Sequence, residues 1–212
     1  MSGKTFVEEE HPRADNGQFT KKGSNNEKKL FSYSKTSINN NFNNGDEKDY
    51  SKIKEEYENA VDNDLLNFIN SCINNPNPKA TKVIGKPTQR HINDIKRLTG
   101  INTSDFDIVL DENLLRHILN GHGKNGASDN SMADIKHLAR VGYIMKNYDD
   151  IDLAYHKNGK RVYSLHYRDS NNSQAPVLVM YKRINGYYVV SEAIVDCKRK
   201  KIAIETAFQP KK

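Results

Sequence analysis

The sequence predicts an α+β domain in which N-terminal helices pack on a four- to five-stranded antiparallel sheet, preceded by a disordered tail. Residues 1–45 are rich in Asn, Ser, Lys and Gly and have few aliphatic side chains to bury, which is typical of disordered segments. Between residues 46 and 148, apolar side chains recur mostly at three- and four-residue spacings, as in amphipathic helices. From residue 152 the spacing becomes strand-like, and helices followed by an antiparallel meander are typical of α+β domains.

Three segments of the chain differ in charge. Residues 1–45 carry 7 basic and 5 acidic side chains. Residues 46–80, expected to form an acidic amphipathic helix, carry 4 basic and 8 acidic side chains. Residues 81–212, the expected α+β domain, carry 22 basic and 14 acidic side chains. The net charge of +8 in the last segment favours a polyanionic partner, although a basic domain without such a partner is equally compatible with the charge alone.

Composition argues against a membrane or a disulfide-stabilised protein. No apolar run approaches the roughly 20 residues that a transmembrane helix needs, and the N-terminus lacks the apolar region of a signal peptide. We therefore expect no membrane partner and a cytoplasmic location. Cys72 and Cys197 have neither the number nor the spacing of a disulfide framework or a zinc site.

Four helices are expected in the first two thirds of the chain. In chain order they are residues 46–74, capped by Asp49 or Ser51 and stopped by Asn74–Pro78; residues 88–100, capped by Thr88; the segment that follows Asp111 as its cap; and residues 132–148. A short strand over residues 107–110 precedes the third helix. The first helix could bind a partner, but packing within the chain is the expected use of its apolar face.

Strands with short turns are expected in the last third. They are residues 152–155, 161–167, 175–183, 187–195 and 202–208. Asn158-Gly159 and Asn185-Gly186 are typical hairpin turns, and residues 198–201 form a basic turn before the last strand.

The stretch Leu115-Arg116-His117-Ile118, followed by Gly121-His122-Gly123, is the most informative feature for function. Two histidines five residues apart do not share a helix face. We expect Gly121 to end the helix in a left-handed cap that redirects the chain at His122. His117 then lies in the last turn, where a helix favours positive charge. Histidines can take up or release a proton near neutral pH.

These residue types suit RNA cleavage, because RNA supplies its own nucleophile, the 2′-hydroxyl. The reaction then needs a base, an acid and a group that stabilises phosphate charge. The candidates for acid and base are His117 and His122, and those for the phosphate are one of Arg116, Arg140 and Lys182 together with the hydroxyl of Thr206. A separate candidate, for RNA binding, is the turn formed by Lys198, Arg199, Lys200 and Lys201. Each of these residues alone is more often structural. No metal site and no cofactor are expected, because the histidines lack a metal-ligand spacing.

Residues from about 105 to 209 resemble the phage-associated Barnase–EndoU–colicin E5/D–RelE-like (BECR-fold) nuclease domains. The resemblance lies in Leu115–Ile118, Gly121–Gly123 and the strands at 177–182, 188–190 and 202–208. It implies helices packed on a four- or five-stranded antiparallel sheet, and a site with a helix-borne histidine near basic and hydroxyl groups of the sheet. It supports His117, His122 and Thr206 as site residues. In the tail, residues 10–22 resemble a short motif of phage and prophage proteins.

The resulting hypothesis is a metal-independent endoribonuclease, a phage or prophage toxin or effector, that cleaves RNA by 2′-hydroxyl attack. Its expected partners are RNA, with tRNA one candidate, and an immunity or host protein; its expected location is the cytoplasm of a bacterial host or delivery by a phage. Two alternatives stay open. One is a catalytically inactive RNA- or protein-binding phage factor that blocks a host system, and the other is a minor virion or assembly protein.

Overall fold

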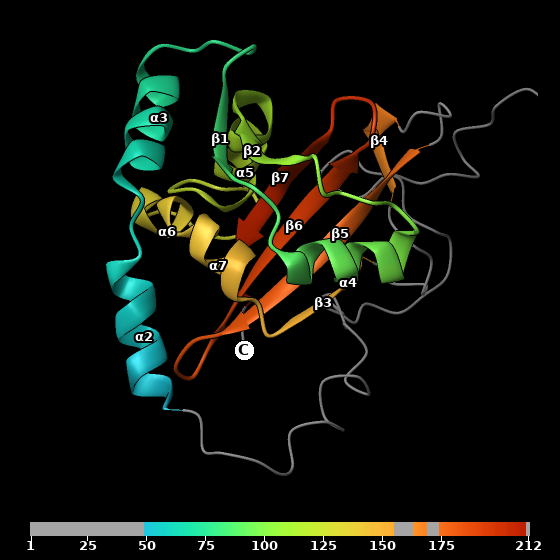
Figure 1. The fold of residues 1–212 in the computed structure, drawn as a ribbon. Helices are drawn as coiled ribbons and strands as arrows, with labels where there is room; N and C mark the ends of the chain where they lie inside the picture. Colours follow the sequence, from blue (N-terminus) through green and yellow to red (C-terminus); the bar gives the residue numbers. More distant parts are fainter. Residues whose placement is uncertain (1–48, 155–162, 169–173, 211–212) are drawn as a thin grey trace, which may run out of the picture. The chain divides into compact units, whose positions relative to one another are not determined.

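The computed structural model describes residues 49–154, 163–168 and 174–210 and is built around a seven-stranded sheet (Figure 1). The side chains of residues 163–168 and 174 are outside this description, as are the expected tail, residues 1–45, and the expected turn at Asn158-Gly159. Within the described part of the chain, none of the helices has the length and apolar character needed to cross a membrane.

Helices dominate the chain before residue 150, and strands dominate after it. The helices are α2 (Tyr50–Asn59), α3 (Asn63–Asn74), α4 (Gln89–Thr99), α5 (Glu112–His122), α6 (Ile135–Ala139) and α7 (Val141–Asn147). The strands are β1 (Thr81–Gly85), β2 (Asp107–Asp111), β3 (Asp150–Leu153), β4 (Tyr163–Arg168), β5 (Gln174–Arg183), β6 (Tyr188–Asp196) and β7 (Lys201–Phe208). The predicted α+β class is confirmed.

The sheet has the strand order β1-β2-β7-β6-β5-β3, and β4 pairs with β5 outside this order. Its strand pairs are antiparallel except for β2 and β7, which are parallel. Seven strands exceed the predicted four to five. The unpredicted strand, β1, lies at the edge of the sheet and exposes Val83, so its sequence lacks the apolar alternation of a strand with one buried face.

Two expected helices are each divided. Where the sequence predicts one helix over residues 46–74, the structure has α2 and α3, because the Asp62 carboxylate accepts a hydrogen bond from Leu65 N–H and starts a new helix. Asp49 caps α2 as expected. The helix expected over residues 132–148 is also two helices, α6 and α7, which meet at Arg140.

The helices bury their apolar faces against one face of the sheet. Leu65 and Ile69 of α3, Ile95 of α4 and Ile118 of α5 belong to the same buried core as the inward residues of β5, β6 and β7. In Figure 1, α4 and α7 cross in front of the sheet, and α7 packs on β5 and β6. The acidic segment that the sequence sets apart therefore contributes to this core.

Helix α5 follows β2 without a loop and packs on the last strand. Asp111 ends β2 and occupies the N-cap position of α5, as predicted, but its side chain makes no capping hydrogen bond. It accepts instead from Thr81 Oγ1 and from Lys201 Nζ. Because β2 pairs only with the first residues of β7, α5 lies along the second half of β7 and brings its C-terminal end to the end of that strand.

Candidate active site

On the face of the sheet opposite the helices, the polar side chains of Glu192 and Thr206 lie among buried apolar residues, namely Val190 and Ile194 of β6 and Ala203 of β7. Ala193 and Val195 of β6 lie in the core with the helices, so Glu192 between the strand's inward residues points to the opposite face. Glu192 pairs directly with Thr206 of β7. On a sheet, directly paired residues of one face hold their Cβ atoms about 5 Å apart, so Glu192 and Thr206 are side-chain neighbours.

A β-bulge in β7 places Thr206 and Phe208 on the face of the sheet that carries Glu192. Glu192 pairs with Thr206 but Ala193 pairs with Ile204, which leaves Glu205 as the extra residue of β7. As a result Ile204 and Ala207 both point into the core, although they are three residues apart. Without the bulge, strict alternation would turn Thr206 toward the helices.

His122 reaches the same end of β7 from the last turn of α5. Its imidazole stacks on the Phe208 ring, with 5.0 Å between the ring centroids and 14° between the planes. On its other side, His122 Nδ1 lies 2.9 Å from Asp129 Oδ2, and only 15% of the His122 side chain is exposed. His122 and Thr206 are therefore brought to one strand end through Phe208, two residues beyond Thr206.

The Asp129 carboxylate is ionised. Burial alone would raise its pKa, but hydrogen bonding from Ser131 and the contact with His122 outweigh this, and the pKa of Asp129 lies below its usual value. An ionised carboxylate only accepts hydrogen bonds, so His122 donates its Nδ1 hydrogen to Asp129. The other ring nitrogen, Nε2, is then the atom that can exchange a proton with a ligand.

The Thr206 hydroxyl makes no hydrogen bond to the part of the chain that the structure describes. Its side chain is 7% exposed, and its Oγ1 has no hydrogen-bond partner among the described residues. The Thr206 carbonyl oxygen, in contrast, accepts from Ser191 Oγ at 3.5 Å. A buried hydroxyl without a partner costs free energy, and such groups are found where a ligand supplies the missing bond.

Sequence reasoning did not identify Glu192 or Asp129. Glu192 had a local signal, because it is the one charged residue in the mostly apolar run from Val189 to Val195. Asp129 had none: it lies in a loop seven residues after His122, and only the path of that loop brings the two side chains together.

The sequence predicts that Gly121, in a left-handed conformation, ends the helix between His117 and His122, and this prediction is wrong. Helix α5 continues through Gly121 to His122, and the residue that follows the helix is Gly123, with φ −74°. His117 and His122 are therefore about 140° apart around one continuous helix axis. His117 is exposed to solvent, and the structure does not bring it to the end of β7.

Two of the basic candidates lie in ion pairs that stabilise the fold. Arg116 Nε and Nη2 donate to Glu112 Oε1 at 2.9 and 2.7 Å, and this carboxylate is fully buried. Lys182 Nζ donates to Asp149 Oδ1 at 3.1 Å, and Asp149 also accepts from the backbone of Arg183. Neither group is placed at the end of β7.

Arg140 belongs to a second cluster, on the helix side of the strand end. Its guanidinium donates twice to the Glu58 carbonyl oxygen and lies over the Tyr57 ring. Arg140, the Tyr57 hydroxyl and the Gln209 amide nitrogen all lie 3.3 to 3.5 Å from His137 Nδ1. Burial, followed by the charge of Arg140, lowers the pKa of His137, so this imidazole is neutral and accepts at Nδ1.

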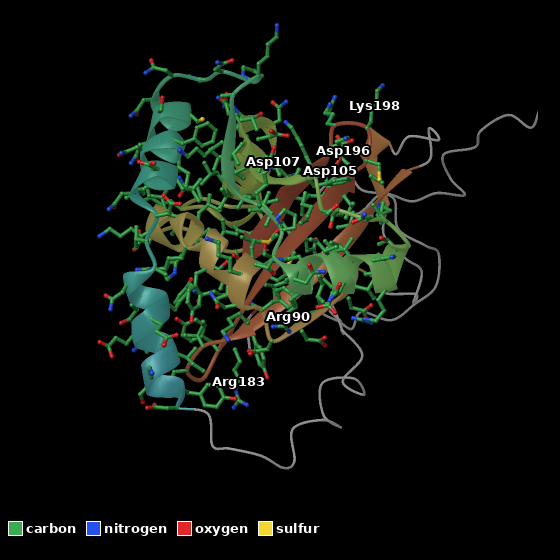
Figure 2. The ribbon with its side chains drawn as sticks, in the orientation of Figure 1. Arg90, Asp105, Asp107, Arg183, Asp196 and Lys198 are labelled. Carbon is green, nitrogen blue, oxygen red and sulfur yellow. The ribbon has the colours of Figure 1, made fainter. Side chains whose placement is uncertain are left out.

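The basic turn lies at the opposite end of the β6–β7 hairpin. Seven residue steps separate Lys201 from Phe208, or about 23 Å of extended strand. Three of its four side chains pair with carboxylates, namely Arg199 with Asp196, Lys200 with Asp105 and Lys201 with Asp111. Figure 2 shows Lys198, Asp196, Asp105 and Asp107 together at this turn, and Arg183 at the far end of the strands.

Among the residues that the structure describes, no three His, Cys, Asp or Glu side chains come together as a metal site would require. What the end of β7 offers is acid–base chemistry: an oriented imidazole, a carboxylate and a hydroxyl. Such a set can move protons and donate a hydrogen bond to an anionic group.

The comparisons with known proteins support the family resemblance. Residues 85–212 match the family described as phage Barnase–EndoU–ColicinE5/D–RelE-like nuclease 3, and this match covers the strand end with His122, Glu192 and Thr206. It begins after α2 and α3 and reaches only the last residue of β1. No curated protein and no solved structure matches the chain.

Proposed function

This chain belongs to the phage-associated Barnase–EndoU–ColicinE5/D–RelE-like nucleases, and we propose that it is a metal-independent endoribonuclease that acts through the residues at the end of β7. The observation that carries the proposal is the arrangement of His122, held by Asp129 and stacked on Phe208, beside the cross-strand pair Glu192–Thr206. The net charge of +8 over residues 81–212 favours a polyanionic substrate.

Each group at the strand end has a role in an attack by the 2′-hydroxyl of RNA. The Glu192 carboxylate takes the 2′-hydroxyl proton as the oxygen attacks phosphorus. The bond from phosphorus to the 5′-oxygen breaks, and protonated His122 gives its Nε2 proton to that oxygen. Thr206 donates its unused hydroxyl hydrogen to a non-bridging phosphate oxygen. The products are a 2′,3′-cyclic phosphate and a 5′-hydroxyl.

The spacing of these groups suits a substrate that lies along the strand. Thr206 and Phe208 are two residues apart on one face, or about 7 Å. His122 lies against Phe208, and Glu192 lies beside Thr206. A ribose and its 3′-phosphate between them would have the carboxylate on one side and the imidazole on the other. DNA lacks the 2′-hydroxyl, so this mechanism is restricted to RNA.

We further propose that the chain acts on RNA, tRNA included, in the cytoplasm of a bacterial host as a phage or prophage effector, with an immunity or host protein as its regulator. This follows from the phage association in the family's description and from the proposed substrate.

The test is incubation of the purified full chain with total RNA and with tRNA in EDTA, followed by mapping of the cleaved ends. His122→Ala and Glu192→Gln should each lower the cleavage rate about 10²–10⁴-fold, as loss of an acid or base does. His117→Ala, on the exposed side of the same helix, and Glu55→Gln, on α2, are matched controls expected to stay within about threefold of the unsubstituted chain.

Four results would contradict the proposal. Cleavage that requires added Mg²⁺ excludes the metal-independent mechanism. Cleavage that survives His122→Ala and Glu192→Gln excludes this site. RNA binding without cleavage by the unsubstituted chain points to the inactive binding factor, and a mapped end with a 3′-hydroxyl excludes 2′-hydroxyl attack.

A further inference from the structure

The loop between α5 and α6 holds Asp129 directly behind the His122 ring. Asp129 Oδ2 lies 2.9 Å from His122 Nδ1, and its Oδ1 accepts from Ser131 N–H at 2.8 Å. Only 13% of the Asp129 side chain is exposed. We propose that Asp129 is a positioning residue, which keeps a proton on His122 Nδ1 and directs Nε2 to the substrate; this inference rests on the function proposed above.

The backbone of the loop is built to keep Asp129 at this position. The Gly121 carbonyl oxygen accepts from the N–H groups of Ser128 and Asp129, at 2.8 and 3.2 Å, so the loop folds back on the helix that carries His122. At Gly126, a Cβ atom would overlap the carbonyl oxygens of Gly121 and Asp129. The carboxylate is therefore placed by a rigid loop and not by a long flexible side chain.

Asp129 also supplies the negative charge that directly contacts the His122 ring. Of the groups packed against the ring, Asp129 carries a negative charge and Phe208 carries none. Among the described residues, the other ionisable groups near this end of the sheet include Glu192 of β6, Glu205 of β7 and Lys124 of the loop and, on the helix side, His137 and Arg140. Replacing Asp129 by a neutral side chain removes the charge that directly contacts the imidazole, and Glu192 and Glu205 remain.

The test uses Asp129→Asn in the full chain, with two readouts. The first is ¹⁵N NMR of the histidine ring nitrogens in the RNA-free protein. The unsubstituted chain should show His122 protonated at Nδ1 when neutral, and Asp129→Asn should increase the form protonated at Nε2. The second is the rate of RNA cleavage: kcat should fall about 10²-fold or more, with KM within about threefold of the unsubstituted chain.

Two comparison variants separate positioning from folding. Asp129→Glu keeps the carboxylate that accepts from Nδ1, so part of the lost kcat should be restored. Ser128→Ala changes the neighbouring residue of the same loop, whose backbone alone contributes, and should alter neither readout. If the His122 ¹⁵N signals of Asp129→Asn match those of the unsubstituted chain, the positioning role is refuted.

The two proposals can fail separately. An unsubstituted chain that cleaves no RNA refutes the proposed function, while the NMR comparison still decides whether Asp129 sets the protonation of His122. A chain that cleaves RNA, with an Asp129→Asn variant that keeps its kcat, refutes the inference and leaves the proposed function in place.

Discussion

Arg116→Ala is expected to weaken the fold and to leave RNA cleavage nearly intact. Arg116 looks like a catalytic cation in the sequence, next to His117, but the structure uses it to neutralise a buried carboxylate. Arg116 Nε and Nη2 both donate to Glu112 Oε1, and Glu112 is 0% exposed. The second carboxylate oxygen, Oε2, accepts from Asn77 N–H, so only one oxygen loses its partners in the variant.

The size of the effect follows from the unequal burial of the two partners. Breaking a fully buried ion pair costs about 3–5 kcal/mol, because one charge stays buried without compensation. An exposed pair contributes at most about 1 kcal/mol. Glu112 is buried but the Arg116 side chain is 44% exposed, so water partly screens the pair and we expect a loss of about 1.5–3 kcal/mol. In a protein of this size, that lowers the thermal midpoint by roughly 3–12 °C.

The assay is thermal or urea unfolding of Arg116→Ala, with RNA cleavage measured at a temperature where the variant is folded. Glu112→Gln supplies the matched background: once the buried charge is gone, Arg116→Ala should cost less than about 1 kcal/mol. Arg116→Lys should restore part of the stability. An unchanged midpoint together with a loss of cleavage of about 100-fold or more would show that Arg116 acts in catalysis and that the structural interpretation is wrong.

Four further outcomes are expected. Thr206→Val should leave the stability unchanged or slightly raised, because the lost hydroxyl has no partner among the described residues, yet slow RNA cleavage at least about tenfold; a clear loss of stability would contradict this. Gly123→Ala should lower the thermal midpoint, because the new methyl group would overlap the Leu119 carbonyl oxygen, and an unchanged midpoint would disprove that contact. Burial lowers the pKa of His91, so the unfolded chain binds more protons than the folded chain as the pH falls below about 6.5. The free energy of unfolding should therefore decrease in this range. His91→Gln should flatten the decrease of the thermal midpoint between pH 7 and pH 5. Replacing residues 198–201 by Gln should change the slope of log Kd for RNA against log salt concentration by no more than about 1, because three of these side chains already pair with carboxylates. A larger change in slope would show that several phosphates bind at this turn.

Local sequence signals predicted the elements whose ends are set by short-range interactions. Thr88 caps α4, and its hydroxyl accepts from His91 N–H, as a threonine before an apolar helical pattern predicts. Gly100 ends the same helix with φ +77°, which glycine adopts without strain. Gly186, with φ +75°, forms the expected turn between β5 and β6. Each of these features depends on residues within four positions of one another.

The breaks in the helices depended on contacts that the local pattern does not contain. The apolar spacing continues through residues 60–62 and through Arg140, so the sequence predicts unbroken helices there. In the structure, Asp62 N–H donates to the Ala139 carbonyl oxygen, and the Arg140 side chain donates to the Glu58 carbonyl oxygen. The two breaks therefore stabilise each other across about 80 residues of sequence.

The sequence by itself determined the α+β class, the strands of the last third and the candidacy of His122 and Thr206, because helical and strand periodicities and a histidine at a helix end are visible over a few residues. Only the tertiary structure decided which candidates meet. One extra residue in β7 turns Thr206 to the face that carries Glu192, and the loop after α5 returns Asp129 to His122. Arg116 and Lys182 lie in structural ion pairs instead. Strand register and loop path are set by packing of the whole core, so the identities of neighbours across the sheet cannot be obtained from local pattern alone.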